Sequence, residues 1–420
     1  AYFSLLQNVL FLKKQVQYHR MKFLFGKKTE YVLMHKDIPV LKGEYSFGNH
    51  CFKSISKILS PAHIPVGAKR SDGSLSINRL NHWFRWRGIP KYRLGLYQLM
   101  QRLGVEQPLD LLEKEYALSL SDTYWLKAED DDATWGQKNF FHRSFDQATF
   151  GQAMFSMLAQ EAGHSARHTP NNTTCGFHRK AWFRQNDTLV LRKGGTPIYQ
   201  QEPVNEWLAS EIGRRLGMDV VPYTTELYEN NLVSVCPIMT DEHTDLVPAA
   251  DILTSLDLND DFHLPYYLKA LKDKGIRNGE KALNEMMILD YLLMNSDRHS
   301  QNFGILIDAD TMEWKKAAPV FDTGTGLGCL VKDDEIMQEL HKNNCQLFNA
   351  KHFAFDLLLE HLSLKNYDLD TLDDLPHLYG EKLLQYQQYT GITNKRIDSA
   401  YRLFYKRVIS LKRYAATHNQ

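Results

Sequence analysis

The apolar and polar positions along this 420-residue chain change their spacing between its first and second halves. Near the start, short apolar runs at residues 31–34 and 38–41 alternate with polar turns and predict strands. Apolar residues then recur at helical spacing over residues 75–116. We therefore expect an α/β subdomain over residues 21–128. The stretch at residues 1–20 reads either as an upstream extension or as an amphipathic helix that packs on the fold.

Residues 129–240 carry the strongest strand signals. An apolar run at residues 188–193 predicts a strand, and residues 202–216 predict the helix that follows it. Two further apolar runs predict a hairpin that turns at Asn230 and Asn231, because asparagine favours tight hairpin turns. Together these elements predict a β-rich lobe.

Residues 241–420 have the pattern of a helical lobe. Residues 280–295 predict a strongly apolar helix, and residues 331–415 carry further helical patterns separated by polar turns. Between them, apolar runs on either side of residues 308–310 predict a β-hairpin. The chain is therefore expected to be an α+β protein with two lobes and an extra N-terminal subdomain.

Composition narrows the classes of function. Hydrophobic residues make up 43% and charged residues 24%, which is typical of a soluble globular protein. Fifty basic residues balance fifty acidic ones, so we expect no direct nucleic-acid partner and no membrane partner. The five cysteines contain no CxxC pair, which argues against a disulfide framework and favours a reducing, cytoplasmic setting.

Three polar residues in the second half have the spacing of a phosphotransferase site. Asn302 follows Asp297 by five residues, and Asp322 lies beyond the predicted hairpin. In protein kinases an Asp receives the hydroxyl proton, an Asn five residues later binds metal, and a later Asp joins the metal to the phosphates. The spacing therefore predicts a kinase that uses ATP and Mg²⁺. His299 either orients Asp297 by a hydrogen bond or acts on the substrate.

A second group of residues has the side chains expected of a nucleotide-binding site. Lys193 ends the predicted strand and Glu206 lies on the next helix, as in the Lys–Glu pair that fixes a lysine on ATP phosphates in kinases. The alternative for Lys193 is a solvated strand end. The loop at residues 169–176 lies where a phosphate-covering loop is expected. It is neither a GxGxxG nor a Walker loop, so an ordinary turn remains its alternative.

Two other motifs compete with this interpretation. Residues 322–324 match the Asp-Thr-Gly signature of aspartic proteases, but no second copy supplies the partner carboxylate. His164 and His168 are spaced to bind zinc, yet the HExxH arrangement is absent. In the simplest alternative, residues 296–299 cap a helix and Asp322 belongs to a turn. The complete set of polar residues favours metal and phosphate chemistry.

Three segments resemble the HipA-like serine/threonine kinases, which include the toxin components of bacterial toxin–antitoxin modules. These segments are residues 202–206 (EPVNE), 297–303 (DRHSQNF) and 318–322 (APVFD). The resemblance extends over about residues 165–400. It implies a bilobal, protein-kinase-like fold with a β-rich N-lobe at residues 129–240 and a helical C-lobe at residues 241–420.

The resemblance also implies roles for individual residues. Asp297 would be the catalytic acid/base residue, with Asn302 and Asp322 as Mg²⁺ ligands. Lys193, paired with Glu206, would hold the ATP phosphates. The remaining implied positions are Cys236, Pro237, Ile238 and Met239 in the adenine-binding hinge, and Thr173, Thr174 and Gly176 in the phosphate loop, where the two threonines are candidate autophosphorylation sites.

The chain departs from the family pattern at three places. Gln301 stands where family members often have Lys, the loop at residues 169–176 lacks the usual glycine pattern, and residues 1–150 match the standard N-terminal subdomain poorly. We expect transfer of the ATP γ-phosphate to a Ser/Thr hydroxyl of a protein substrate and to the kinase itself, and a cognate antitoxin is an implied partner. Two alternatives remain: a small-molecule phosphotransferase and a kinase-shaped binding scaffold without turnover.

Overall fold

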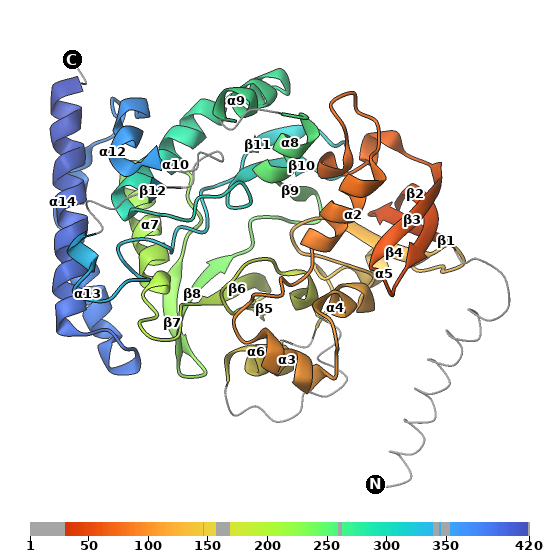
Figure 1. The fold of residues 1–420 in the computed structure, drawn as a ribbon, viewed down its shortest axis with the longest axis horizontal. Coiled ribbons are helices and arrows are strands. Elements are labelled where there is room, and N and C mark those ends of the chain that lie inside the picture. Colours follow the sequence, from red (N-terminus) through yellow and green to blue (C-terminus); the bar gives the residue numbers. More distant parts are fainter. Residues whose placement is uncertain are drawn as a thin grey trace, which may run out of the picture.

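Three parts of the chain follow one another across the computed structural model: an N-terminal subdomain, a β-rich N-lobe and a helical C-lobe (Figure 1). The N-terminal subdomain, drawn in red and orange, lies on the opposite side from the last helix, drawn in dark blue. The structure describes residues 30–145, 147–156, 169–258, 263–338, 344–345 and 353–418. The predicted extension at residues 1–20 and the histidine pair His164 and His168 lie outside the described residues.

The N-terminal subdomain contains an antiparallel sheet of four strands in the order β3-β2-β1-β4. The strands are β1 (Glu30–His35), β2 (Ile38–Ser46), β3 (Cys51–Ile58) and β4 (Tyr124–Ala128). Leu33 and its cross-strand partner Leu41 pack with Phe84 in one apolar cluster. The two strands predicted in this region are confirmed.

The predicted helical region of this subdomain consists of three helices. They are α2 (Ile77–Trp86), α3 (Leu96–Leu103) and α4 (Pro108–Lys114). The side chain of Ser76 accepts a hydrogen bond from the first turn of α2, which explains where that helix begins. Gly104 ends α3 with a left-handed φ of 59°, as glycine commonly does after a helix.

The N-lobe sheet is also antiparallel, with the strand order β5-β6-β8-β7. Its strands are β5 (Lys180–Gln185), β6 (Thr188–Gly194), β7 (Thr224–Tyr228) and β8 (Asn231–Pro237), and the short helices α5 (Trp135–Lys138) and α6 (Ala148–Phe155) precede them. Helix α7 (Glu202–Leu216) follows β6 and ends at Gly217. The predicted strand and the helix after it are confirmed.

The predicted hairpin is present, but its turn lies one residue earlier than expected. Tyr228 pairs with Asn231, so the two turn residues are Glu229 and Asn230. Both have positive φ, 48° and 58°. A two-residue turn of this kind needs positive φ at both central positions, and here a glutamate occupies one of them.

The C-lobe is mostly helical. Its helices are α8 (Ala249–Ser255), α9 (Leu264–Asp273), α10 (Gly279–Leu293), α12 (Phe355–Leu358), α13 (Leu375–Gln385) and α14 (Asn394–His418). The predicted apolar helix is α10, which lies at the centre of the lobe with most of its residues buried. A helix that is apolar on nearly all sides belongs in a core.

Two small sheets complete the C-lobe. The predicted hairpin is formed by β10 (Gly304–Asp308) and β11 (Trp314–Ala317), and β9 (Thr244–Pro248) adds a third strand that the sequence pattern did not predict. The other sheet pairs β12 (Asn344–Cys345) with β13 (Phe353–Ala354).

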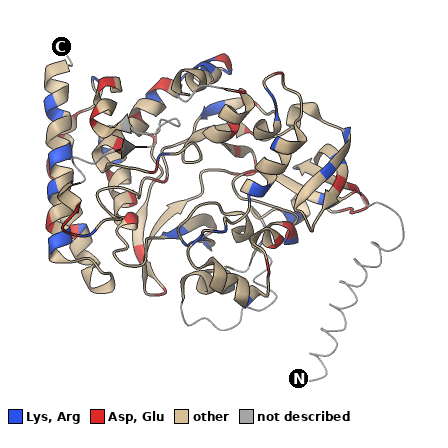
Figure 2. Ribbon diagram, in the orientation of Figure 1, with Lys and Arg blue, Asp and Glu red and all other residues tan. Residues whose placement is uncertain are grey.

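Charged residues of both signs are spread over all three parts of the molecule, and basic residues recur along α14 (Figure 2). The basic side chains of α14 form ion pairs with acidic side chains of the C-lobe. These pairs are Lys395–Asp334, Arg396–Asp333, Arg402–Asp398, Arg407–Asp356 and Lys412–Asp370. Five of the basic side chains of α14 are thus paired within the lobe.

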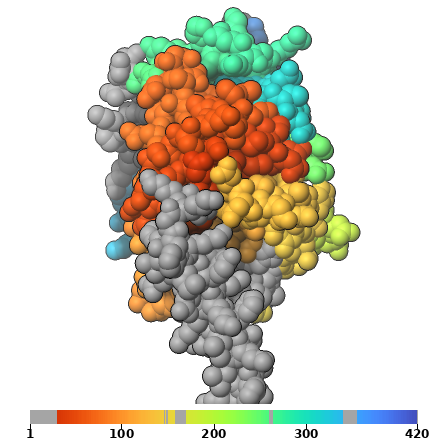
Figure 3. Space-filling view, turned by 90° about the vertical axis from the view of Figure 1, so that its right-hand side faces the viewer, coloured from red at the N-terminus to blue at the C-terminus, as the bar shows by residue number. Residues whose placement is uncertain are grey.

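The N-terminal subdomain contacts both lobes. His35 Nε2 lies 2.8 Å from the carboxylate of Asp245 in the C-lobe, and Arg79 pairs with Asp257. On the other side, Trp125 shares an apolar cluster with Leu189 of the N-lobe. Figure 3 shows the red and orange surface of the subdomain directly against the green surface of the C-lobe. Through these contacts the subdomain joins the two lobes.

Among the described residues, no helix has the length and apolar character required to cross a membrane. The cysteines with described side chains, Cys51, Cys175, Cys236 and Cys329, are free thiols.

Candidate active site

A cavity of about 1180 Å³ lies where the three parts of the chain meet. It is lined by α2 and the segment before β4, by the N-lobe strands β5, β6 and β8, and by α8 and the loops after α10 and β11. The predicted site residues that line it are Asp297, His299, Asn302, Asp322, Lys193, Thr173, Thr174, Gly176, Pro237, Ile238 and Met239. Glu206 is buried behind Lys193. The structure therefore brings all these residues to one place.

The loop that carries Asp297 is held by a buried arginine. Helix α10 ends where Met294 takes a left-handed φ of 51°, and this turns the chain toward the cavity. The Arg298 side chain has no exposed surface, and its Nε and Nη2 both donate to the carboxylate of Asp290 on α10, each at 2.9 Å. A buried, fully paired guanidinium positions the loop and does not reach the substrate.

Arg298 also holds together the two predicted metal ligands. Its Nη1 donates to the backbone carbonyl of Asn302 at 2.5 Å and to that of Phe321 at 2.7 Å. These carbonyls lie on either side of the β10–β11 hairpin, so Asn302 and Asp322 are held at the same end of it. The Asn302 side-chain NH₂ donates to the backbone carbonyl of Asp297 at 2.9 Å, so its oxygen remains available to a metal ion.

The segment after Asp322 explains the protease-like Asp-Thr-Gly signature. The side chain of Asn205 on α7 donates to the carbonyls of Gly324 and Gly326 at 2.8 and 2.9 Å. A Cβ at Gly326 would lie 2.2 Å from the carbonyl oxygen of Leu293. The glycines therefore permit close packing on α7 and α10. Asp322 itself has a φ of 55°, a strained value for a residue other than glycine and one that recurs at functional sites.

Lys193 lies between two carboxylates. Its Nζ donates to Glu206 at 2.6 Å and also to Asp322, and the hydroxyl of Ser234 donates to the other oxygen of Glu206. Burial lowers the pKa of Lys193, but the Asp322 and Glu206 charges outweigh burial and raise the pKa above its ordinary value. Burial raises the pKa of Asp322, but the Lys193 and Lys180 charges hold it well below its ordinary value. Both partners are therefore charged at neutral pH.

Asp297 has the electrostatic character of a base. Burial is the largest cause that raises its pKa; the His299 charge opposes this rise, and the Asp322 charge adds to it. A carboxylate with a raised pKa is a better proton acceptor near neutral pH. His299 Nε2 lies 3.9 Å from the Asp297 carboxylate, which is too long for a hydrogen bond. The hydrogen bond considered for His299 is therefore not formed.

The loop at residues 169–176 is folded inward and held by Arg93, a residue that sequence reasoning missed. Arg93 donates to the hydroxyl of Thr174 at 2.7 Å, to the Thr174 carbonyl at 2.6 Å and to the Gly176 carbonyl at 3.0 Å. The hydroxyls of Thr173 and Thr174 each donate to the carbonyl three residues earlier, at 2.9 Å. Both threonines are buried, so their phosphorylation would require the loop to open.

Lys180 is a second lysine in the site that sequence reasoning missed. It lies opposite Lys193 on the paired strands β5 and β6, and it is buried against the cavity. A Cβ at Gly176 would lie 2.6 Å from its Nζ, so glycine lets the amine approach the phosphate loop. The Lys180 amine forms no hydrogen bond or ion pair with any described residue. Burial lowers the pKa of its amine to about 8. An unpaired buried amine is a site for an anion.

The predicted hinge lies where the N-lobe passes into the C-lobe. Pro237, Ile238 and Met239 stand at the end of β8, and the Ile238 N–H donates to the carbonyl of Leu189 at 2.9 Å. Ile307 of β10 lines the cavity from the other lobe. Apolar side chains from both lobes thus line the cavity, which suits an apolar ring.

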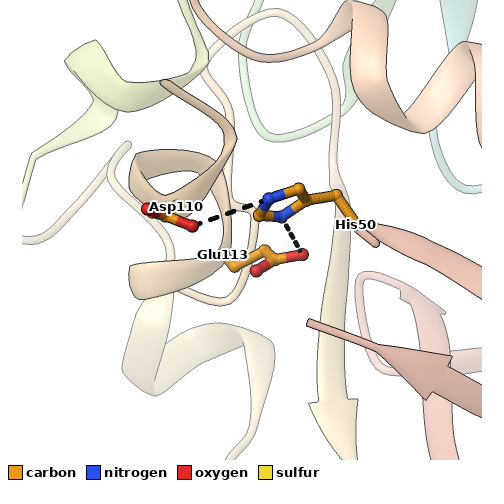
Figure 4. A group of neighbouring side chains, drawn as sticks. All are labelled: His50, Asp110 and Glu113. Atoms are coloured by element: carbon orange, nitrogen blue, oxygen red, sulfur yellow. Dashed lines mark ion pairs between the residues drawn. The ribbon is translucent and has the colours of Figure 1, made fainter. Parts of the chain in front are cut away.

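The donor set fits magnesium-bound ATP. Mg²⁺ takes oxygen ligands and usually shares them with substrate phosphates, as Asn302 and Asp322 would allow. Elsewhere among the described residues, three side chains of metal-binding type have their ligand atoms within 4.8 Å of one another. They are His50, Asp110 and Glu113 (Figure 4). His50 Nδ1 lies 2.9 Å from Glu113, and Nε2 lies 3.6 Å from Asp110, so the imidazole joins the turn after β2 to α4. This group does not line the cavity.

No protein-family model matches the chain. The chain is 30% identical over 161 residues to the serine/threonine-protein kinase CtkA of Helicobacter pylori, a match that covers 36% of this chain. It spans about half, 48%, of the length of this curated relative. The crystal structure of CtkA aligns with a TM-score of 0.44 and 21% identity, over 57% of this chain and 95% of that chain.

The fold matches that of HipA from Shewanella oneidensis, solved in complex with HipB and operator DNA. The TM-score is 0.54 at 13% identity, over 92% of this chain and 97% of the HipA chain. The chain therefore has the bilobal α+β fold of the HipA-like kinases, and the predicted fold class is confirmed. Because 92% of the chain aligns, the match includes most of the N-terminal region that resembles the family poorly in sequence.

Proposed function

We propose that this protein is a serine/threonine protein kinase that uses ATP and Mg²⁺. The observation that carries the proposal is the convergence of Asp297, Asn302, Asp322 and Lys193 on one cavity between the lobes. Kinases place these residue types around the phosphates and the acceptor hydroxyl. The sequence similarity to CtkA, a serine/threonine-protein kinase, supports a Ser/Thr hydroxyl as the acceptor.

Each residue of the site would have its own role in phosphate transfer. Bound ATP supplies the phosphoryl group, and Mg²⁺ at Asn302 and Asp322 would offset the phosphate charge. Lys193 and Lys180 place two further positive charges on the phosphate side of the cavity. Asp297 accepts the proton of the acceptor hydroxyl. Arg298 keeps the loop fixed, so little reorganisation is needed at the moment of transfer.

The proposal is tested with labelled ATP, Mg²⁺ and a mixture of Ser- and Thr-containing peptides. We expect the wild-type protein to label peptides and itself, with its own phosphate detected by intact mass. Nucleotide binding in a thermal-shift assay without transfer to any acceptor would contradict the proposal and support the binding scaffold. Phosphate on a hydroxylated small molecule such as kanamycin, and on no peptide, would support the small-molecule phosphotransferase.

A toxin role in the reducing cytoplasm is a finer part of the same proposal. The HipA neighbour is described in complex with HipB, and the shared fold supports a cognate antitoxin as partner of this chain. Induced expression of the wild-type protein should then arrest bacterial growth, whereas Asp297→Asn should not. Equal growth of the two strains at equal protein levels would count against the toxin role.

A further inference from the structure

The cavity has two halves that differ in what surrounds them. The nucleotide half contains Lys180, Lys193, the hinge and Asp322. The acceptor half is bounded by α2, by the segment before β4 and by α8, with Trp83, Trp86, Arg87, Asp122, Asp245 and Asp251 in its lining. The volume of about 1180 Å³ exceeds the roughly 300–1,000 Å³ usual for one small ligand, so a second molecule has room beside the nucleotide.

The acceptor half contains buried carboxyl groups that lack a full set of partners among the described residues. Arg87 pairs with Asp122 through two hydrogen bonds of 2.9 and 2.6 Å. Asp245 is only 1% exposed; one of its oxygens accepts from His35 at 2.8 Å, and the other is buried without a hydrogen-bond partner in the described part of the chain. The Asp251 carboxyl group forms no hydrogen bond or ion pair with any described residue. Burial, and then the Asp122 charge, raise the pKa of Asp251 to about 7.

Asp251 lies between the N-terminal subdomain and the catalytic loop. A Cβ at Gly67 would be 2.7 Å from the Asp251 carboxyl group, so the subdomain packs directly on this side chain. The adjacent Ala250 N–H donates to the carbonyl of Ser300 at 2.9 Å, which ties α8 to the loop that carries Asp297. The unpaired carboxylate is therefore close to the segment where the acceptor hydroxyl must bind.

Exposed apolar side chains line the cavity. Trp86, Tyr92, Phe177 and Leu330 are between 41% and 61% exposed, and all four line the cavity although they come from four separate segments. Exposed apolar groups around a cavity are typical of a surface that binds another polypeptide. We call these four residues the rim.

We propose that the acceptor half binds a polypeptide segment that presents a lysine or arginine side chain close to the phosphorylated Ser or Thr. This inference rests on the proposed function and names its substrate class. The cationic group would pair with Asp251, and its aliphatic part would lie on Trp83 and Trp86. Apolar side chains of the segment would pack on the rim.

The test uses a library of Ser/Thr peptides in which each position near the acceptor is fixed in turn as Lys, Arg, Asp or Leu. We expect the wild-type protein to prefer Lys or Arg at one or more positions. The ratio of kcat/KM for the best Lys peptide to its Leu counterpart is then measured in Asp251→Asn. Because a hydrogen bond to a charged group contributes about 1.5–3 kcal/mol, this ratio should fall at least about tenfold.

Matched controls separate recognition from general damage. Asp273→Asn, an exposed carboxylate on α9, should leave the Lys/Leu ratio unchanged. Trp86→Ala should raise the peptide KM several-fold, whereas Tyr405→Ala, another exposed aromatic outside the cavity, should not. The KM for ATP is measured in each variant, because a merely structural defect would change it as well.

The outcomes distinguish this inference from the proposed function. If peptides are phosphorylated without a basic preference, or if Asp251→Asn keeps the wild-type ratio, the inference is wrong and the kinase proposal stands. If the wild-type protein phosphorylates no peptide and not itself, the kinase proposal fails. Phosphorylation of kanamycin but of no peptide would overturn the polypeptide acceptor.

Discussion

The two halves of the cavity differ in how their charges are balanced. In the nucleotide half, Lys193 is already paired with Glu206 and Asp322 before any ligand binds. In the acceptor half, Asp251 has no partner among the described residues, and one oxygen of Asp245 is unsatisfied. The nucleotide half is therefore largely preorganised, with the Lys180 amine left for the phosphates, whereas the carboxyl groups of the acceptor half gain further interactions from the molecule that binds there. Four predictions test this contrast.

The largest effect is expected at Asp297, which lies where the two halves meet. Asp297→Asn removes the proton acceptor but keeps the side-chain shape, so phosphate transfer should fall by about 10²–10⁴-fold. ATP affinity, measured by isothermal titration calorimetry, should stay close to wild type. Asp273→Asn serves as the control with full activity. Transfer at the wild-type rate would remove Asp297 from the reaction.

The paired charges of the nucleotide half predict a stability effect. Lys193→Met leaves the Glu206 and Asp322 carboxylates without their cation, and breaking a buried pair in this way costs about 3–5 kcal/mol. Urea unfolding should show this loss, together with weaker ATP binding. The double variant Lys193→Met/Glu206→Gln should recover part of the stability and none of the ATP affinity. An unchanged unfolding midpoint for Lys193→Met would show that the pair contributes little.

The unpaired lysine of the nucleotide half predicts a pH dependence. Phosphates favour the charged form of Lys180, so ATP affinity should fall by up to tenfold per pH unit above about pH 8, where the unliganded amine loses its proton. The pKa of Lys180 in the folded chain lies below its ordinary 10.5, so the unfolded chain binds more protons between these values. The contribution of Lys180 to unfolding free energy therefore rises with pH across this window.

Two variants isolate this pH effect. Lys180→Arg stays charged above pH 8 and should show a flatter affinity profile. Lys180→Met should bind ATP weakly at every pH. A wild-type slope retained in both variants would assign the titration to another group.

The smallest effect is expected at the phosphate loop. Arg93→Met removes three hydrogen bonds to Thr174 and Gly176, so the loop should open more often. We expect the KM for ATP to rise several-fold, since each bond contributes about 1 kcal/mol. Phosphate on Thr174 should increase, as peptide mapping would show, and Arg402→Met on α14 is the matched control. Less phosphate on Thr174 than in wild type would contradict the view that Arg93 keeps it buried.

The contrast between the two halves of the cavity also explains how many of the site residues could be predicted from the sequence. Asp297 and Asn302 lie in one short loop, and Lys193 and Glu206 lie on consecutive elements, so local spacing was enough to indicate the nucleotide half. Arg87 and Asp122, by contrast, are 35 residues apart and meet only through the tertiary fold. No periodic pattern could have placed such residues in the acceptor half.

The strands show a similar limit. The strand β6 and the hairpin strands had continuous apolar runs and were predicted, whereas β9 was missed because its partner β10 follows only after three helices. Lys180 was missed because β5 was missed. Once that strand is recognised, the strand register places Lys180 opposite Lys193. Arg93 had no sequence signal, because its role depends on a loop about eighty residues away.

The contact of the N-terminal subdomain with both lobes has a consequence for kinetics. In a protein whose two lobes meet only at a hinge, little free energy is needed to open the cleft, and nucleotides exchange quickly. Here the pair His35–Asp245 and the packing of Trp125 with Leu189 must yield before the lobes can separate. We therefore expect slow release of ADP, which would limit turnover more than the chemical step does. Rapid-quench experiments should then show a first turnover faster than the steady-state rate.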